Sequence, residues 1–70
     1  MRVVFTSHAE QRMKARNIQK EKVLETLNKP DKTVKRLGKH YFRKKFPKGV
    51  IEAVCEKTGG YFKVITVYWD

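Results

Sequence analysis

The sequence predicts a small α+β fold in the order βααββββ, with two N-terminal helices packed on one face of an antiparallel sheet. Two observations predict it. Residues 7–28 carry helix-start signals and apolar residues at helical spacing, and the chain from Asp31 onward is a series of short apolar and basic runs. Turn signals separate these runs at Leu37-Gly38-Lys39, Pro47-Lys48-Gly49 and Thr58-Gly59-Gly60. Seventy residues suffice for one hydrophobic core, so we expect a single domain over residues 1–70.

The first strand and the first helix are expected at the N-terminus. Residues 2–5 are largely β-branched and aromatic, which is typical of a strand. Ser7-His8-Ala9-Glu10 matches a capping box, so a helix should begin near Ser7. This helix should run to about Arg16, with Ala9 and Met13 as its apolar stripe, and Asn17 is suited to a left-handed stop.

The second helix and the meander follow. Residues 20–28 predict a helix because Val23, Leu24 and Leu27 share one face, and Pro30 prevents its continuation. The turn signals leave four strands, which we expect near residues 32–37, 40–46, 49–56 and 61–69.

The charge of the chain favours a polyanionic partner. Lysine and arginine number 17 against 7 acidic residues, giving a net charge of +10 that is spread from Arg2 to Lys63. Such a charge attracts nucleic-acid phosphates, which release counterions when neutralised. The alternative interpretation is a solvated basic surface with no specific partner.

The single cysteine and the N-terminus indicate the compartment. Cys55 lies in an apolar run, cannot form an internal disulfide, and is expected to be a small core residue in a reducing environment. Residues 1–6 contain too short an apolar run for a signal peptide, and no segment has the roughly 20 apolar residues of a membrane helix. We therefore expect a cytoplasmic protein.

The first predicted helix carries a candidate catalytic ridge. His8, Arg12 and Arg16 are four residues apart, so they fan over one helix face. The positive end of the helix dipole and the neighbouring Arg12 both disfavour an imidazolium, and a neutral His8 would suit a general base acting on a ribose 2′-hydroxyl. The guanidinium groups would hold the phosphate. The alternative is a solvated charged face with a structural histidine.

Residues 39–46 interleave cations with aromatic rings, a mixture suited to RNA because rings stack on bases and cations follow the backbone. Strand alternation should send Tyr41, Arg43 and Lys45 to one face and Phe42, Lys44 and Phe46 to the other. We expect the phenylalanines in the core and the Tyr41 set towards solvent or ligand. An edge strand kept soluble by lysine would look the same. The RNA-binding candidates are Lys39, His40, Arg43, Lys44 and Lys45.

The last strand should alternate Phe62, Val64, Thr66 and Tyr68 against Lys63, Ile65, Val67 and Trp69. Tyr68 is a candidate for an acid or a phosphate ligand, although aromatic residues in strands more often serve packing, and either Tyr41 or Tyr68 could assist the catalytic ridge. The sequence shows no zinc-type Cys/His spacing, no phosphate-binding glycine loop and no carboxylate pair placed to share a metal. Any phosphodiester chemistry is therefore expected to be metal-independent and to use no cofactor.

Together these residues resemble a known family. The series His8-Ala9-x-x-Arg12-Met13-x-x-Arg16-x-Ile18, then Val23, Leu27, Asn28-x-Pro30-Asp31, Gly38, Tyr41 and Val64-Ile65-Thr66-Val67-Tyr68 resembles the DUF4258 family. That family is usually grouped with RelE-like toxins in the barnase, EndoU, colicin and RelE assemblage of metal-independent ribonuclease folds. The opening His-Ala-x-x-Arg-Met is the most specific part of the match.

The resemblance implies a RelE-like sheet and an endoribonuclease of the toxin–antitoxin type, inhibited by an acidic antitoxin protein. Carried over by position, His8, Arg12 and Arg16 are the expected polar signature, with Tyr41, Thr66 and Tyr68 as weaker matches. The leading hypothesis is cleavage of single-stranded or ribosome-bound RNA by 2′-hydroxyl attack. The alternatives are a non-catalytic RNA-binding module and a protein-interaction module with an acidic partner.

Overall fold

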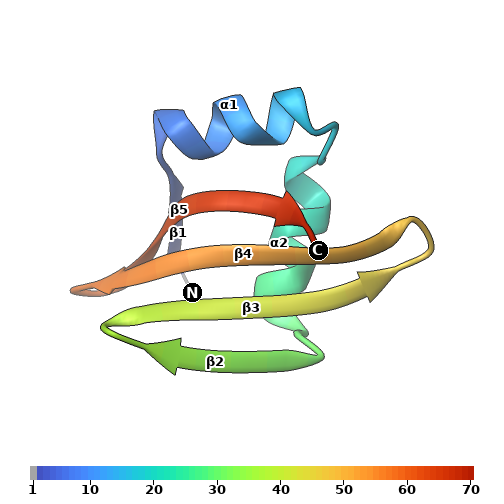
Figure 1. Cartoon of the computed structure of the whole chain (residues 1–70). Coiled ribbons are helices and arrows are strands. Elements are labelled where there is room, and N and C mark those ends of the chain that lie inside the picture. The colour runs from blue at the N-terminus through green and yellow to red at the C-terminus, as the bar shows by residue number, and fades with distance from the viewer. Residues whose placement is uncertain (1) are drawn as a thin grey trace.

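The computed structural model describes residues 2–70, which form two helices and five strands (Figure 1). Both helices lie on the same side of the sheet, with α1 along β5 and α2 across β4 and β3. The α+β prediction and the order of elements are confirmed. The bounds are β1 Arg2–Phe5, α1 Ser7–Ala15, α2 Lys20–Asn28, β2 Lys32–Arg36, β3 Lys39–Phe46, β4 Gly49–Thr58 and β5 Tyr61–Trp69.

The sheet has the strand order β1-β5-β4-β3-β2. Strands β2 to β5 form the expected antiparallel meander, but β1 pairs with β5 in parallel, from Arg2 opposite Tyr61 to Phe5 opposite Val64. The prediction of a wholly antiparallel sheet is therefore wrong, and the sheet is mixed. Turn signals fix the direction of strands that follow each other in the chain. They carry no information about β1, whose partner is the last strand and whose direction depends on the long crossover between them.

The cap of α1 is Thr6 rather than Ser7. Thr6 has extended backbone angles, and its side-chain oxygen accepts a hydrogen bond from the Ala9 amide at 3.0 Å. The same hydroxyl donates to the Ile65 carbonyl at 3.3 Å, so it joins the helix start to β5. The predicted capping box placed the cap one residue too late, because Ser7 already has helical geometry and belongs to the first turn.

The C-terminal end of α1 is closed by Asn17 in the predicted left-handed conformation, with φ 56°. The Ile18 amide donates to the Met13 carbonyl at 2.8 Å, and the Asn17 amide donates to the Lys14 carbonyl at 3.3 Å. This pattern is a Schellman motif, in which Ile18 also packs on Met13 in the core. The motif turns the chain sharply into α2.

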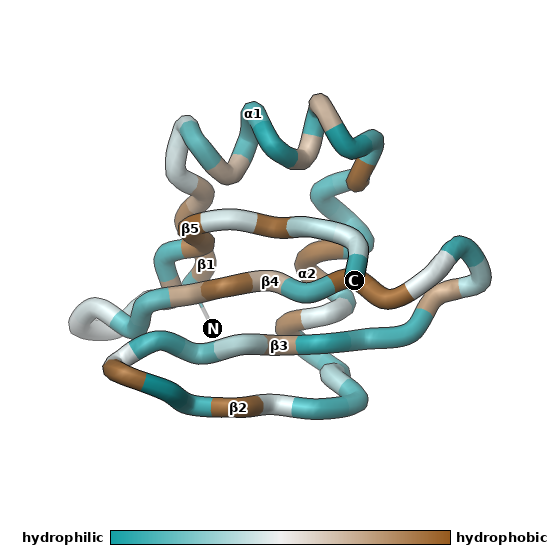
Figure 2. Tube along the Cα trace, viewed as in Figure 1, coloured by the Kyte–Doolittle hydropathy of each residue, from teal (hydrophilic) through white to brown (hydrophobic). Residues whose placement is uncertain are grey.

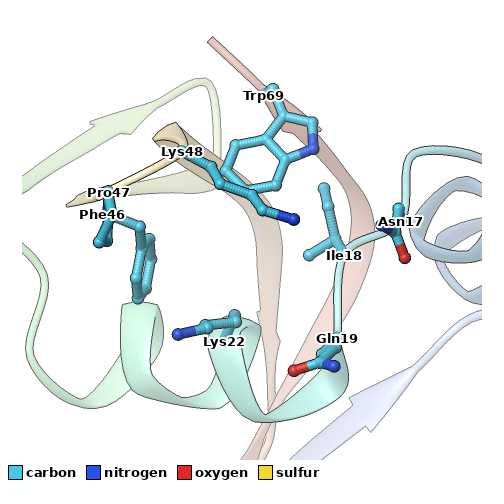
Figure 3. Close-up of a pocket in the computed structure, with 8 residues that line it drawn as sticks. All are labelled: Asn17, Ile18, Gln19, Lys22, Phe46, Pro47, Lys48 and Trp69. Carbon is cyan, nitrogen blue, oxygen red and sulfur yellow. The ribbon is translucent and has the colours of Figure 1, made fainter.

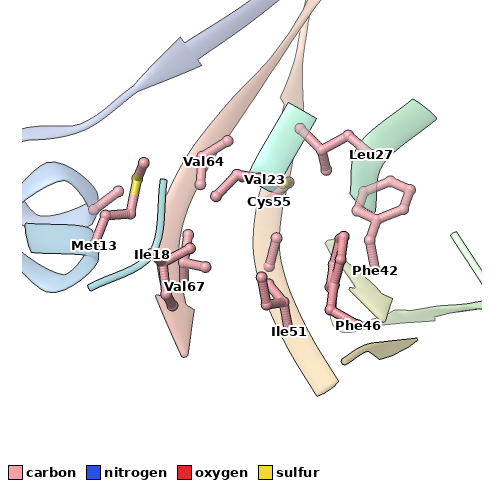
Figure 4. Packing of buried hydrophobic residues seen from close by; sticks show 12 residues of the cluster. Met13, Ile18, Val23, Leu27, Phe42, Phe46, Ile51, Cys55, Val64 and Val67 are labelled. Carbon is pink, nitrogen blue, oxygen red and sulfur yellow. The ribbon is translucent and has the colours of Figure 1, made fainter. Parts of the chain in front are cut away.

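The core lies between the helices and the sheet. Figure 2 shows the hydrophobic residues of β4 and β5, several of which belong to this core. Figure 4 shows Met13 of α1 beside Val64 of β5, and Leu27 of α2 beside Phe42 of β3. The expected burial of the strand phenylalanines is confirmed. The buried cluster comprises Ala9, Met13, Ile18, Val23, Leu27, Phe42, Phe46, Ile51, Ala53, Cys55, Val64 and Val67.

Cys55 is fully buried among these apolar side chains, as the sequence predicted. Burial raises the pKa of its thiol to about 12, because the apolar surroundings disfavour the thiolate. The thiol is therefore protonated at neutral pH and is unsuited to act as a nucleophile.

A β-bulge in β5 changes which side chains share a face. Val54 of β4 pairs with Thr66 whereas the next residue, Cys55, pairs with Val64, so Ile65 is an extra residue in β5. Strict alternation would have grouped Tyr68 with Val64, and that prediction is wrong. The extra residue reverses the alternation beyond it, a property of bulges that the apolar pattern of this strand does not reveal.

The dual role of Thr6 leads to a stability prediction. Replacing Thr6 with alanine removes both the helix cap and the link to Ile65, and should lower the free energy of unfolding by about 1 kcal/mol. Ser7→Ala is the matched control, and its effect should stay within about 0.5 kcal/mol. Urea unfolding followed by circular dichroism measures both. A larger loss for Ser7→Ala than for Thr6→Ala would contradict the assignment of the cap.

Candidate functional site

The sheet face opposite the helices, here called the open face, carries charged and aromatic side chains. Strand pairing and the burial of the alternate residues place on it Lys32, Val34 and Arg36 of β2, Lys39, Tyr41, Arg43 and Lys45 of β3, Val50, Glu52, Val54 and Glu56 of β4, and Lys63, Thr66 and Tyr68 of β5. The sequence expectation that the Tyr41 set points away from the core is confirmed.

One cross-strand row of the open face combines opposite charges with a phenol. Lys32 lies opposite Arg43, Arg43 opposite Glu52, and Glu52 opposite Tyr68, so the row spans four adjacent strands. Together with Tyr41, these side chains line a hollow of about 310 Å³, here called the sheet hollow. Its remaining lining residues are Val34 and Arg36.

Glu52 is the centre of the polar contacts in the sheet hollow. The Tyr68 hydroxyl donates a hydrogen bond to a carboxylate oxygen of Glu52, and Arg43 Nε lies 3.7 Å from the other oxygen. Arg43 also pairs with the Asp70 carboxylate. Within residues 2–70, the buried Arg43 Nε has no hydrogen-bond acceptor.

The hydrogen bond to Glu52 raises the pKa of Tyr68 to about 12, with a smaller contribution from partial burial. Ionisation of the phenol would remove the donor and place a second negative charge beside the carboxylate. Tyr68 is therefore a neutral hydrogen-bond donor at physiological pH, which suits an acid or a phosphate ligand rather than a base.

The ridge predicted on α1 is divided by the structure. Arg12 Nε donates to His8 Nε2 at 3.4 Å, and both side chains are exposed. Arg16 instead donates from Nη1 to the Val67 carbonyl at 2.9 Å, and its own carbonyl accepts from Trp69 Nε1 at 2.9 Å. Arg16 thus attaches the end of α1 to β5.

The candidates from residues 39–46 also separate between the two faces. Arg43 lies in the sheet hollow, Lys39 pairs with Glu56 elsewhere on the open face, and Lys45 is exposed. His40 and Lys44 point to the helix side. The His40 ring is parallel to the Phe42 ring and meets the Phe62 ring edge-to-face, and Lys44 Nζ donates to the Lys29 carbonyl at 3.0 Å.

Three charged residues of the sheet hollow were not among the sequence candidates, namely Lys32, Arg36 and Glu52. Glu52 offered one signal, since it is a lone carboxylate in the apolar run around Ile51 and Ala53. The role of Glu52 in the hollow depends on its contacts with Tyr68 and Arg43 from other strands, and the sequence alone does not show these contacts.

These features define a small basic α+β protein in which two helices cover one sheet face while charged and aromatic residues occupy the other. The chain belongs to the DUF4258 family, since the family model described as a domain of unknown function (DUF4258) matches residues 5–69. The resemblance to this family inferred from the residues is confirmed. Comparisons with curated proteins and with solved structures found no match.

Within residues 2–70, neither helix has the length and apolar character needed to cross a bilayer.

The contact between Glu52 and Tyr68 predicts a pH effect. Because the pKa of Tyr68 in the fold, about 12, exceeds the ordinary value of 10.0, the contact stabilises the fold below pH 10.0 and loses this effect as the pH rises towards 12. Glu52→Gln should return the pKa of Tyr68 towards 10.0. An ultraviolet titration of tyrosinate measures the shift, and Tyr68→Phe identifies which transition belongs to Tyr68. An unchanged Tyr68 titration in Glu52→Gln would refute the proposed cause.

Proposed function

We propose that this protein is a metal-independent endoribonuclease that binds single-stranded RNA across the open face and cleaves it by 2′-hydroxyl attack. The observation that carries the proposal is the sheet hollow. A carboxylate, a neutral phenol and a guanidinium lie there in contact, through Glu52, Tyr68 and Arg43. Lys32 and Arg36 add positive charge at its border.

Each group of the sheet hollow suits one requirement of the reaction. The Glu52 carboxylate would take the proton of the ribose 2′-hydroxyl as the 2′-oxygen forms its bond to phosphorus. As the bond from phosphorus to the 5′-oxygen breaks, the neutral Tyr68 hydroxyl would protonate the departing oxygen. Arg43, Lys32 and Arg36 would hold the phosphate oxygens and stabilise their developing charge. The products would be a 2′,3′-cyclic phosphate and a 5′-hydroxyl.

The helix α1 offers a second place for the base of the same reaction. His8 and Arg12 are in contact on the exposed face of α1, which places an imidazole beside a guanidinium. In this version His8 would take the 2′-hydroxyl proton and Arg12 would contact the phosphate, with Tyr41 or Tyr68 assisting. Arg16 would contribute chiefly by holding α1 against β5.

The proposal includes a relationship to RelE-like ribonuclease toxins and, with it, a role as the toxin of a toxin–antitoxin pair in the cytoplasm. Its support is the order βααββββ, the DUF4258 membership and the +10 charge. An acidic antitoxin protein would be attracted to such a surface by charge complementarity. The RNA substrate would be single-stranded or ribosome-bound.

A non-catalytic RNA-binding module is the second candidate. It is favoured by β2, in which every residue is exposed and three of five are basic, namely Lys32, Lys35 and Arg36. A cationic edge strand beside Tyr41 can follow an RNA backbone without cutting it.

The proposed cleavage is tested by incubating a mixed-sequence single-stranded RNA with the purified protein in EDTA and separating the products on a gel. The wild type should cleave, and Glu52→Gln should lower the rate by about a hundredfold or more if Glu52 is the base. Glu56→Gln removes a carboxylate from the same strand and face and is the matched control. His8→Ala and Arg12→Ala test the alternative centre on α1.

The outcomes separate the candidates. Loss of cleavage in His8→Ala with normal activity in Glu52→Gln would move the base to α1. Cleavage unaffected by all four variants would indicate a contaminating nuclease. An absence of cleavage on naked and ribosome-bound RNA, with RNA retention that weakens as salt rises, would support the binding module instead.

A further inference from the structure

A second hollow, here called the indole pocket, lies on the helix side of the sheet. It has a volume of about 270 Å³ and sits between the α1–α2 connection, the β3–β4 turn and the end of β5 (Figure 3). Its walls include Ile18, Lys22, Phe46, Lys48 and Trp69. None of these residues belongs to the sheet hollow.

Trp69 forms a flat wall of this pocket and is held in place before any ligand arrives. Its indole nitrogen donates to the Arg16 carbonyl at 2.9 Å, which fixes the orientation of the ring. Ile18 and Phe46 are buried and continue the apolar surface.

Two lysines place positive charge beside these apolar walls. Lys22 Nζ lies 5.0 Å from the centroid of the Phe46 ring, and Figure 3 shows Lys48 extending past the Trp69 ring towards Ile18. Within residues 2–70, neither lysine forms an ion pair, whereas Lys20, Lys39, Lys44 and Lys63 each pair with a carboxylate. Both are available to an anion from outside.

Positive charge also lines a second hollow that includes the indole. A neighbouring hollow is lined by Arg16, Asn17, Lys48 and Trp69, so Lys48 and the indole are shared by two adjoining depressions. The combination of a fixed flat ring and surrounding cations is the arrangement by which proteins hold unpaired nucleotides, with the base stacked and the phosphate neutralised.

We propose that the indole pocket binds one nucleotide unit of a single-stranded RNA, its base against Trp69 and its phosphate at Lys48 and Lys22. This inference rests on the proposed function for the identity of the polymer. A planar base gains from stacking on the indole, whereas the carboxylates of an acidic peptide would engage the lysines alone. Tyr68 lines the sheet hollow, and the next residue, Trp69, lines the indole pocket on the other side of the sheet. An RNA strand that leaves the sheet hollow around the end of β5 would therefore reach the indole pocket.

Trp69 is the only tryptophan, so its fluorescence reports directly on this pocket. A short single-stranded RNA, a nucleoside monophosphate and a short acidic peptide are titrated separately, with filter retention of the RNA measured in parallel. The RNA should quench the fluorescence, and the double variant Lys22→Ala/Lys48→Ala should weaken its binding about tenfold. Lys14→Ala/Lys57→Ala removes the same charge from exposed positions outside the pocket and should leave the fluorescence titration nearly unchanged.

The two readouts distinguish this inference from the proposed function. RNA retention without quenching, or quenching that is indifferent to Lys22 and Lys48, would refute the indole pocket while leaving RNA binding intact. Equal affinity for the monophosphate and the RNA would assign the pocket to free nucleotides, which overturns the strand-binding version. Quenching by the acidic peptide without RNA binding in either readout would overturn both proposals. Circular dichroism of the lysine variants verifies that they remain folded.

Discussion

The free edge of β5 is the constraint on which the arrangement of this small protein depends. Within residues 2–70, β1 pairs with Tyr61–Val64 of β5, and the carbonyl groups of β5 beyond that point need other donors. The segment around α1 supplies them, because the Thr6 hydroxyl donates to the Ile65 carbonyl and the Arg16 guanidinium to the Val67 carbonyl. These two contacts stand at the two ends of α1. They hold the helix parallel to the strand edge, with Ala9 and Met13 directed into the core.

The bulge at Ile65 lies within this fixed edge and determines what each sheet face presents. Beyond it, Val67 and Trp69 turn to the helix side, and Thr66 and Tyr68 turn to the open face. Two chemically different hollows therefore meet at the end of one strand. One gathers a carboxylate, a phenol and cations suited to phosphodiester chemistry, and the other gathers an indole and lysines suited to holding a nucleotide. The chain is short and carries a net charge of +10, so its charges repel one another in the folded state. A polyanionic ligand that binds the folded state would therefore also increase the free energy of unfolding.

The sequence predicted much of the local structure because local rules govern it. Asn17 ends the first helix since asparagine tolerates the left-handed conformation, and the alternation in residues 39–46 correctly separated Phe42 from Tyr41. The errors arose where a partner distant in the sequence decides the outcome. Thr6 caps the helix and also bonds to β5, and the bulge at Ile65, set by the pairing with β4, moves Tyr68 to the open face.

By itself the sequence determined the two helices, the four-stranded meander, the basic character and the membership of the DUF4258 family. Each of these follows from short-range sequence patterns or from the amino-acid composition. Only the tertiary structure decided that β1 runs parallel to β5, that Arg16 serves as an anchor, and that Glu52 stands between Arg43 and Tyr68. The physical reason is common to all three. Strand pairing and side-chain contact join residues separated by long stretches of chain, and a one-residue bulge is enough to exchange the two faces of a strand.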